Sequence, residues 1–307
     1  MDTRQVLLAD AFAADPGGGV PVAVLPDAAD LGNEQVRAVA RELAALVTTV
    51  PTDSPPESLR AVGPRGTADP HAVAVAAIAV AAERGWLDGD DDGFTLTIAG
   101  ADLDVTVAGD GRAWVDIDEP DPQTADVDVG AVADALGIDG ATLRDVGADL
   151  PPFRVSAGVE ALAVPVNFLE HLGSATPDPA ALGALAGVDV VCPFTFDTLA
   201  ADTACHARTF VPRDTSASRA GSARSWVRET GSEVPVVPGV AAGVATHLVR
   251  EGVVEAAEPV VEGGHYLDRP GRVHVDPDGP RVGGRAVLSL DGRVTVPPAG
   301  DDDILEL

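Results

Sequence analysis

The longest uninterrupted apolar stretch of the chain, residues 72–82, places Ala, Val and Ile on every side of a helical wheel. A helix that lies on a protein surface keeps one polar face, so this segment must be enclosed by other structure. It is too short to cross a membrane, and Glu83, Arg84 and Gly85 end it with a glycine stop. The pattern therefore predicts a buried helix over about residues 71–84.

A similar arrangement occurs again later in the chain. Residues 238–252 begin with proline and end in Arg-Glu-Gly, which predicts a second enclosed helix over about residues 239–251. A short strand-like run with a Pro-Arg pair precedes each helix, in residues 59–66 and 207–214. Alternating strand patterns with Gly and Asp-Gly turns follow each helix. The chain thus consists of two similar halves, which join near residues 118–124.

These patterns predict an α+β fold with two similar β-barrel-like lobes, each wrapped around a central helix. We expect one lobe in residues 1–120 and the other in residues 121–307, with a final strand that can return to the first lobe. The halves should face each other across a cleft, with the start of each enclosed helix near it. Helix starts carry free N–H groups and partial positive charge, so this cleft suits a small carboxylate.

The charge balance narrows the choice of partners. All 20 basic residues are arginine and 49 residues are acidic, which gives a formal net charge of −29. Such an excess argues against binding to nucleic acid. Because the acidic residues are spread along the whole chain, they indicate a solvated surface suited to very high salt, where screening removes the self-repulsion. The alternative is an acidic patch for a cationic partner.

Several other segments favour simple structural roles. The first residues lack the basic start and apolar core of a signal peptide, so we expect a cytoplasmic protein without a membrane segment. Cys192 and Cys205 match no zinc spacing and are expected to be buried thiols. Residues 88–93, DGDDDG, copy the opening of a calcium loop, but Ala99 stands where its final glutamate should be. A solvated turn is the better interpretation there, as is a solvated tail at residues 301–303.

The chain resembles the PhzF-like phenazine-biosynthesis isomerases, relatives in fold of diaminopimelate epimerase, over nearly its whole length. The segments that match this family in order and spacing are ADAFAADPGGGVPVAVLPDAADL, ARELAALVTTV, LRAVGPRGTADPHAVAVAA, VSAGVEALAVPV, HARTFVPR, EVPVVPGVAAGVATHLVREG, EGGHYLDRPGRV and RVGGRAV. The resemblance implies two barrels around central helices, a site in the cleft that uses no metal or cofactor, and a homodimer. It also implies a small carboxylated metabolite as the ligand.

The resemblance also shows where this chain departs from the family pattern. In this chain Val47 stands at the position of the family's proton-moving glutamate. Val234 stands at the position of its aspartate, and Val20 at the position of the asparagine in its GNP turn. Valine cannot accept or return a proton. Only the histidine of the GHAT-like segment is kept, as His71. Its plainer interpretation is a polar residue hydrogen-bonded locally at a helix start.

We therefore expect His71 to be the catalytic residue, and Gly19, Thr48 and Gly239 to contact the substrate. Gly19 belongs to a GGG turn, and the alternative explanation for these three glycines is a flexible turn without a role in binding. Glu42 and Glu233 lie near the missing carboxylates. A shift of one residue in a strand turns a side chain to the opposite face, so neither is expected to replace them.

Two functions from different classes remain open. The first is an isomerase-like enzyme that moves a proton on a small carboxylated metabolite through His71. The second is a non-catalytic relative that binds a metabolite or another partner in a cleft lined by Val20, Val47 and Val234. A thiol racemase is not expected, because the helix starts carry Pro-His and Pro-Gly instead of two opposed cysteines.

Overall fold

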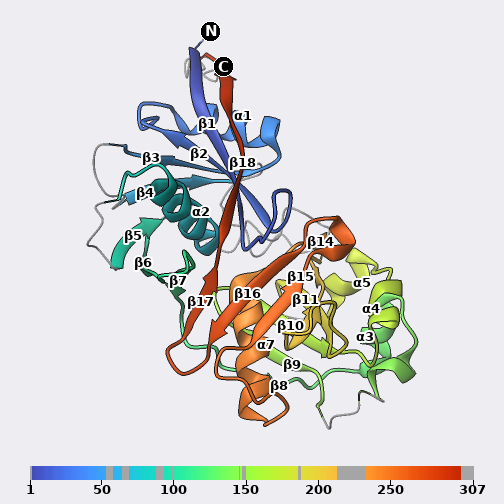
Figure 1. Cartoon of the computed structure of the whole chain (residues 1–307). Coiled ribbons are helices and arrows are strands. Elements are labelled where there is room, and N and C mark those ends of the chain that lie inside the picture. The colour runs from blue at the N-terminus through green and yellow to red at the C-terminus, as the bar shows by residue number, and fades with distance from the viewer. Residues whose placement is uncertain are drawn as a thin grey trace, which may run out of the picture.

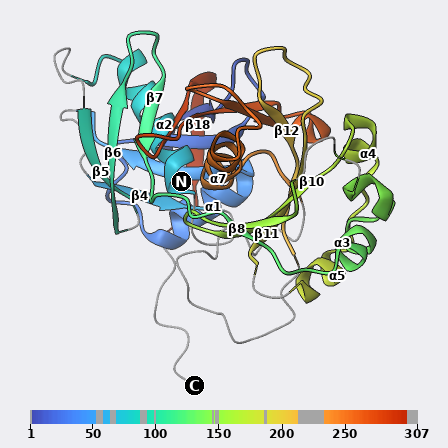
Figure 2. The same cartoon turned by 90° about the horizontal axis from the view of Figure 1, so that it is seen from below.

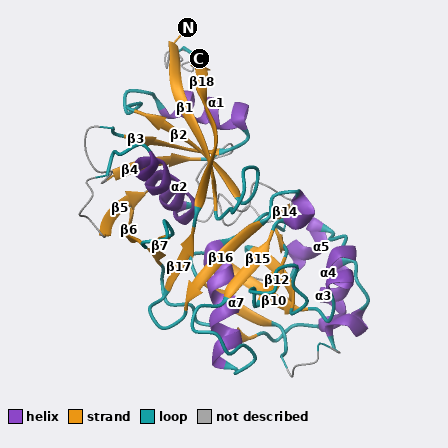
Figure 3. Ribbon diagram, viewed as in Figure 1, coloured by secondary structure: helices purple, strands orange, loops and turns teal. Residues whose placement is uncertain are grey.

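The computed structural model describes residues 2–52, 58–63, 69–87, 93–98, 100–144, 146, 150–185, 188–212 and 233–298. The acidic turn predicted at residues 88–93, apart from Gly93, and the tail at residues 301–303 lie outside these ranges. The fold is mixed α+β, with a large sheet of 18 strands and a small number of helices (Figure 3). Within the described residues, no helix is both long and apolar enough to cross a membrane.

The strands follow one another along the chain with short connections in most places. Their bounds are β1 (Asp2–Ala11), β2 (Val20–Pro26), β3 (Leu46–Val50), β4 (Ser58–Val62), β5 (Gly93–Ile98), β6 (Ala101–Val107), β7 (Ala113–Asp116), β8 (Gln123–Thr124), β9 (Phe153–Ser156), β10 (Glu160–Pro165), β11 (Val190–Thr195), β12 (Cys205–Ala207), β13 (Thr209–Phe210), β14 (Glu233–Val234), β15 (Val260–Gly263), β16 (Gly271–Asp276), β17 (Arg281–Gly284) and β18 (Ala286–Val296). The helices are α1 (Asn33–Leu43), α2 (Pro70–Glu83), α3 (Val129–Leu136), α4 (Leu169–Ser174), α5 (Pro179–Ala184) and α7 (Pro238–Arg250).

The same order of strand pairings occurs twice. From β1 to β7, neighbouring strands pair antiparallel, parallel, antiparallel, parallel, antiparallel and antiparallel. Strands β9, β10, β11, β12, β15, β16 and β17 repeat this order. In each half an enclosed helix, α2 or α7, connects the two strands of the second parallel pair. The ladder between β7 and β17 joins the two series. Closure of each half into a barrel and the division at residue 120 remain predictions.

Helix α2 confirms the first predicted helix almost to the residue. Nine of its side chains are fully buried, because it packs against strands β1, β2, β3, β5, β7 and β18. Asp69 caps its start, and Gly85 follows its last turn with a φ of 68°. An Ala- and Val-rich helix has little side-chain volume, so strands can approach it on all sides. This packing explains the absence of a polar face in residues 72–82.

Helix α7 confirms the second predicted helix, and two glycines set its position. A Cβ atom on Gly239 would lie 2.1 Å from the carbonyl oxygen of Ala157, and one on Gly243 would lie 1.9 Å from Val155. The helix therefore rests directly on β9 and the turn that follows it. Figure 2 looks along α7 and shows α3, α4 and α5 together beyond strands β10 to β12, on the side away from α7. Those three helices cover a second core, which includes Leu136, Leu172 and Leu182.

The two ends of the described chain lie side by side. Strand β18 pairs antiparallel with β1, from Asp2 opposite Val296 to Ala11 opposite Ala286 (Figure 1). Helix α1 covers one face of the β1–β3 region, where Val36, Val39 and Ala40 are buried. Exposed and buried positions alternate along α1 as they do in an amphipathic surface helix.

Candidate active site

A cavity of about 510 Å³ lies where the starts of α2 and α7 meet. Its walls come from both halves of the chain: the starts of α2 and α7, strand β6, the end of β7 with the two residues after it, and the turn between β9 and β10. The lining residues are Asp69, Pro70, His71, Ala101, Asp102, Leu103, Asp104, Asp116, Ile117, Asp118, Ala157, Gly158, Val159, Val237 and Gly239. Two of the four predicted site residues, His71 and Gly239, therefore line one cavity. The expectation that both helix starts lie beside one cleft agrees with this geometry.

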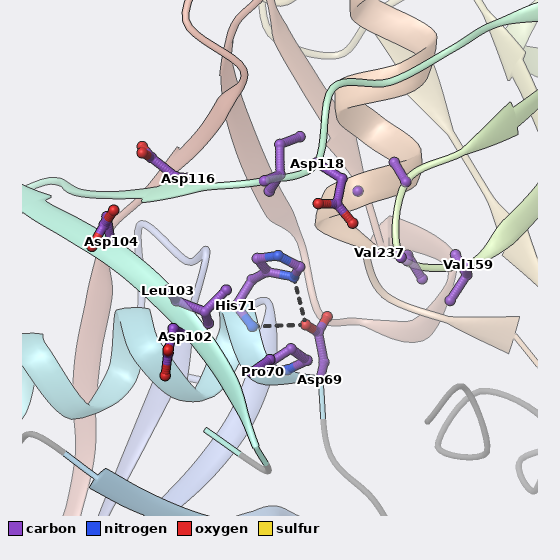
Figure 4. Close-up of a pocket in the computed structure, with 15 residues that line it drawn as sticks. Asp69, Pro70, His71, Asp102, Leu103, Asp104, Asp116, Asp118, Val159 and Val237 are labelled. Atoms are coloured by element: carbon purple, nitrogen blue, oxygen red, sulfur yellow. Dashed lines mark hydrogen bonds and ion pairs between the residues drawn. The ribbon is translucent and has the colours of Figure 1, made fainter. Parts of the chain in front are cut away.

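His71 stands at the start of α2 and is held by a neighbouring carboxylate. Asp69 Oδ1 accepts a hydrogen bond from the backbone N–H of His71 at 3.0 Å and lies 3.2 Å from its ring Nδ1 (Figure 4). The side chain of Asp69 is only 2% exposed and that of His71 is 15% exposed. The ring thus keeps limited access to the cavity while one of its nitrogens is engaged.

The start of α7 differs from the start of α2. Its N-cap residue, Val237, makes no hydrogen bond from its side chain to the helix. Pro238 has no N–H, so the N–H of Gly239 is the first one available at this end, beside the cavity. Free N–H groups and the helix dipole favour an anion. The start of α2 is less suited to an anion, because the carboxylate of Asp69 already occupies it.

Four exposed aspartates line the cavity. Asp102 and Asp104 project from β6, Asp116 ends β7, and Asp118 follows it (Figure 4). Thr97 and Thr95 donate hydrogen bonds to Asp102 and Asp104, respectively. Within the part of the chain that the structure describes, no group of three or more His, Cys, Asp or Glu is arranged to hold a metal ion. We name Asp102, Asp104, Asp116 and Asp118 the acidic mouth.

The other two predicted substrate contacts lie elsewhere, and their role stays a prediction. Gly19 donates its N–H to the carbonyl of Pro270, and its carbonyl accepts from Arg269 Nε at 2.9 Å. Both polar groups of its backbone are therefore used within the fold. Thr48 is completely buried in β3, and its hydroxyl has no hydrogen-bond partner in the described residues. Neither residue lines the cavity.

The three valines at the family's functional positions lie outside this cavity. Val47 is completely buried in the core between the sheet and α1, and Val20 and Val234 are half-buried. None of the three is among the lining residues of the cavity at His71. A cleft lined by these valines stays a prediction. Position 47 faces α1 because alternate residues of a strand point to opposite faces.

The nearby glutamates are also accounted for. Glu233 forms a bidentate ion pair with Arg208, whose Nε and Nη2 donate to its two oxygens at 2.9 and 2.8 Å. Arg208 also donates to carbonyls at the end of α4, so this pair has a structural role. Glu42 is exposed on α1. As expected, neither carboxylate lines the cavity.

The cysteines are unsuited to proton transfer. Cys192 and Cys205 are buried and not joined by a disulfide. Burial raises the pKa of the Cys192 thiol to about 12 and also raises the pKa of Cys205. Neither thiol lines the cavity, in agreement with the sequence-based argument against a thiol racemase.

Asp69 and the acidic mouth are features of the cavity that the sequence interpretation missed. The signal for Asp69 was present, because an aspartate directly before a proline is typical of a helix N-cap. The alternation in residues 101–107, ADLDVTV, shows that Asp102 and Asp104 share one face of a strand. Their position at the cavity depends on the pairing of β6 with β7, which no local pattern specifies.

Comparisons with known proteins agree with this fold. A family model described as phenazine biosynthesis-like protein (PhzC-PhzF) matches residues 9–224, well over half of the chain. YfhB of Bacillus subtilis (strain 168), an uncharacterized isomerase, is 28% identical over 303 residues, which span 95% of this chain and 96% of that protein.

Solved structures show the same similarity. A PhzF-family protein from Bacillus anthracis has a TM-score of 0.78 at 20% identity, covering 96% of this chain and 100% of that one. A predicted epimerase from Pseudomonas aeruginosa has a TM-score of 0.70 at 26% identity, with the same coverage of both chains. The match of the family model over most of the sequence is decisive. This chain belongs to the phenazine biosynthesis-like PhzC-PhzF family.

Proposed function

We propose that the protein is an isomerase-like enzyme that transfers a proton on a small carboxylated metabolite, in the cavity between the starts of α2 and α7. Membership of the PhzC-PhzF family and the isomerase and epimerase names of its relatives support an isomerase-like function. The observation that carries the proposal is the presence of a partly exposed imidazole, His71, and an uncapped helix start at Gly239 in one cavity.

The roles follow from the chemistry of these groups. The substrate carboxylate binds at the N–H groups that begin α7, which places the rest of the molecule toward His71. The imidazole removes a proton from a carbon, and the electron pair of the broken C–H bond stays on the substrate. The imidazolium exchanges its proton with water and then returns a proton to another carbon, so no oxidant or second substrate is needed.

A second function is favoured by the electrostatics of the opening. The lining includes five aspartates, and no arginine is found among the described lining residues. This surface would repel an anion at low salt, and the matched carboxylate positions hold valine. A non-catalytic relative that binds a metabolite without changing it is therefore the competing proposal.

Deuterium exchange distinguishes the two functions. A panel of cyclic and amino carboxylic acids is incubated with the protein in deuterium oxide and molar salt, and exchange is followed by proton NMR. We expect exchange on at least one acid, and His71→Gln should lower its rate about a hundred- to ten-thousandfold.

His171→Gln provides the matched control. His171 lies on α4, pairs with Asn167 at 2.6 Å and does not line the cavity, so exchange should continue in this variant. If no acid in the panel exchanges, yet several raise the unfolding temperature of the wild type, the binding function replaces the enzyme.

A further inference from the structure

We infer that Asp69 is a positioning residue, which holds the imidazole of His71 with Nε2 toward the substrate and stabilises the ring when it is protonated. This inference rests on the proposed function, because it concerns the same site. It assigns a role to a residue that matches none of the family positions discussed above.

The hydrogen bond fixes one ring nitrogen. A carboxylate can only accept, so the proton shared between Asp69 Oδ1 and the ring, 3.2 Å apart, lies on Nδ1. Nε2 is then the ring nitrogen with a free lone pair. Proton removal from a substrate needs such a lone pair in a defined direction. The imidazolium that follows has the negative charge of Asp69 beside it.

Helix capping alone does not explain this aspartate. Asp128, Asp139 and Asp178 also cap helix starts, where each accepts from the backbone N–H two residues later. All three are exposed, whereas the side chain of Asp69 is 2% exposed. A buried carboxylate costs free energy that an exposed one does not. A neutral Ser or Asn would cap α2 without that cost.

The second carboxylate oxygen of Asp69 strengthens this conclusion. Oδ2 is buried and makes no hydrogen bond in the described residues, so the charge is only partly satisfied by the fold. An unsatisfied buried carboxylate oxygen is destabilising in the resting protein. That cost is offset when the neighbouring ring becomes positively charged, which is the state that follows proton removal.

The first test compares two aspartates that share the sequence Asp-Pro at a helix start. Asp69→Ser keeps a capping hydroxyl but is too short to reach the His71 ring, and Asp178→Ser makes the same change at α5. On an acid that exchanges, Asp69→Ser should lower kcat about a hundredfold and alter the pH profile, with KM nearly unchanged. Asp178→Ser should leave kcat, KM and the pH profile as in the wild type.

The second test does not depend on activity. With histidine labelled by ¹⁵N and the His71 signals assigned through His71→Gln, wild-type protein should show protonated Nδ1 and unprotonated Nε2. Asp69→Ser should lose this preference, and Asp178→Ser should keep it. Asp69→Asn is the alternative variant if the serine protein does not fold, because asparagine keeps the cap and removes only the charge. It should also reduce kcat.

The outcomes separate this inference from the proposed function. Unchanged ring signals in Asp69→Ser, or an unchanged kcat where exchange exists, would overturn the role of Asp69 and leave the isomerase proposal intact. Absence of any exchange in the wild type removes the isomerase proposal, and the ring signals then still decide whether Asp69 orients His71.

Discussion

Two of the histidine–carboxylate pairs among the described residues have similar geometry and different surroundings. Nδ1 of His71 lies 3.2 Å from Asp69 at the cavity, and Nδ1 of His206 lies 3.0 Å from Glu262 in the interior. His206 is completely buried and its Nε2 makes no hydrogen bond in the described residues, whereas His71 reaches the cavity. A pair of this kind becomes a candidate for catalysis only when a substrate can reach the second ring nitrogen.

The carboxylates of the two pairs also differ in their other hydrogen-bond partners. Asp69 caps one helix, whereas Glu262 accepts the backbone N–H groups of Leu199 at 2.6 Å and Ala200 at 3.2 Å. Glu262 therefore fixes a loop as well as a ring. We expect the interior pair to contribute to stability and the cavity pair to contribute to rate, and four measurements test this distinction.

Removal of Glu262 should have the largest effect. Glu262→Ala leaves buried His206 and the backbone N–H groups of Leu199 and Ala200 without their partner, which should lower the free energy of unfolding by about 3–5 kcal/mol. Urea unfolding in molar salt measures this loss. The kcat of the folded variant should equal that of the wild type, and a large fall in kcat would assign the interior pair to catalysis.

Acid should weaken the interior pair. Burial alone would raise the pKa of Glu262, but hydrogen bonds from His206, Leu199 and Ala200 lower it below its ordinary value of 4.5. A lowered folded-state pKa stabilises the protein above the ordinary value, and this contribution is lost as the pH falls through the folded-state pKa. The stability difference between wild type and Glu262→Gln should therefore shrink between pH 7 and about pH 3. A stability difference that stays constant over this pH range would contradict the lowered pKa of Glu262.

Salt should weaken the repulsion between surface charges and leave the interior pair unaffected. With a formal net charge of −29, the wild type should gain stability from low to molar salt, where charges are screened within about 3 Å. The stability difference between wild type and Glu262→Ala should stay constant, because that pair is enclosed. Thermal unfolding of both proteins over a salt series tests this, and a salt-independent wild type would remove the halophilic interpretation.

The acidic mouth should give the smallest effect. Asp118→Asn removes one exposed negative charge near His71, so the KM for a carboxylic acid should fall at low salt by about twofold. The difference should vanish in molar salt. Asp126→Asn changes an exposed aspartate that does not line the cavity and should have no effect. Equal KM values for both variants at low salt would show that the mouth does not influence binding.

The enclosed helices were predictable because their signals are local. Apolar residues on all sides of residues 72–82, a proline at each start and a glycine after each end are all visible in the sequence, and α2 and α7 confirm them. The repeat of strand pairings could be suspected from two similar halves. The register of those strands could not be predicted, because it depends on contacts between distant segments.

The site was predictable only in part. His71 followed from the family resemblance together with its place at a helix start. The apolar cleft of three valines stays a prediction, and Val47 is buried on the side of the sheet that α1 covers. The partner of His71 stands only two residues away, but its burial depends on the surrounding fold, and an Asp-Pro helix start alone does not reveal it.

The pairing of β1 with β18 has a consequence for synthesis of the chain. Residues 2–11 are synthesised long before their partner strand, residues 286–296. At about 5–20 residues per second, one edge of β1 waits roughly 15–60 s for its partner. During that time β1 can pair only with β2. The newly made first half therefore carries an open strand edge, at which two nascent chains could join before either one is finished.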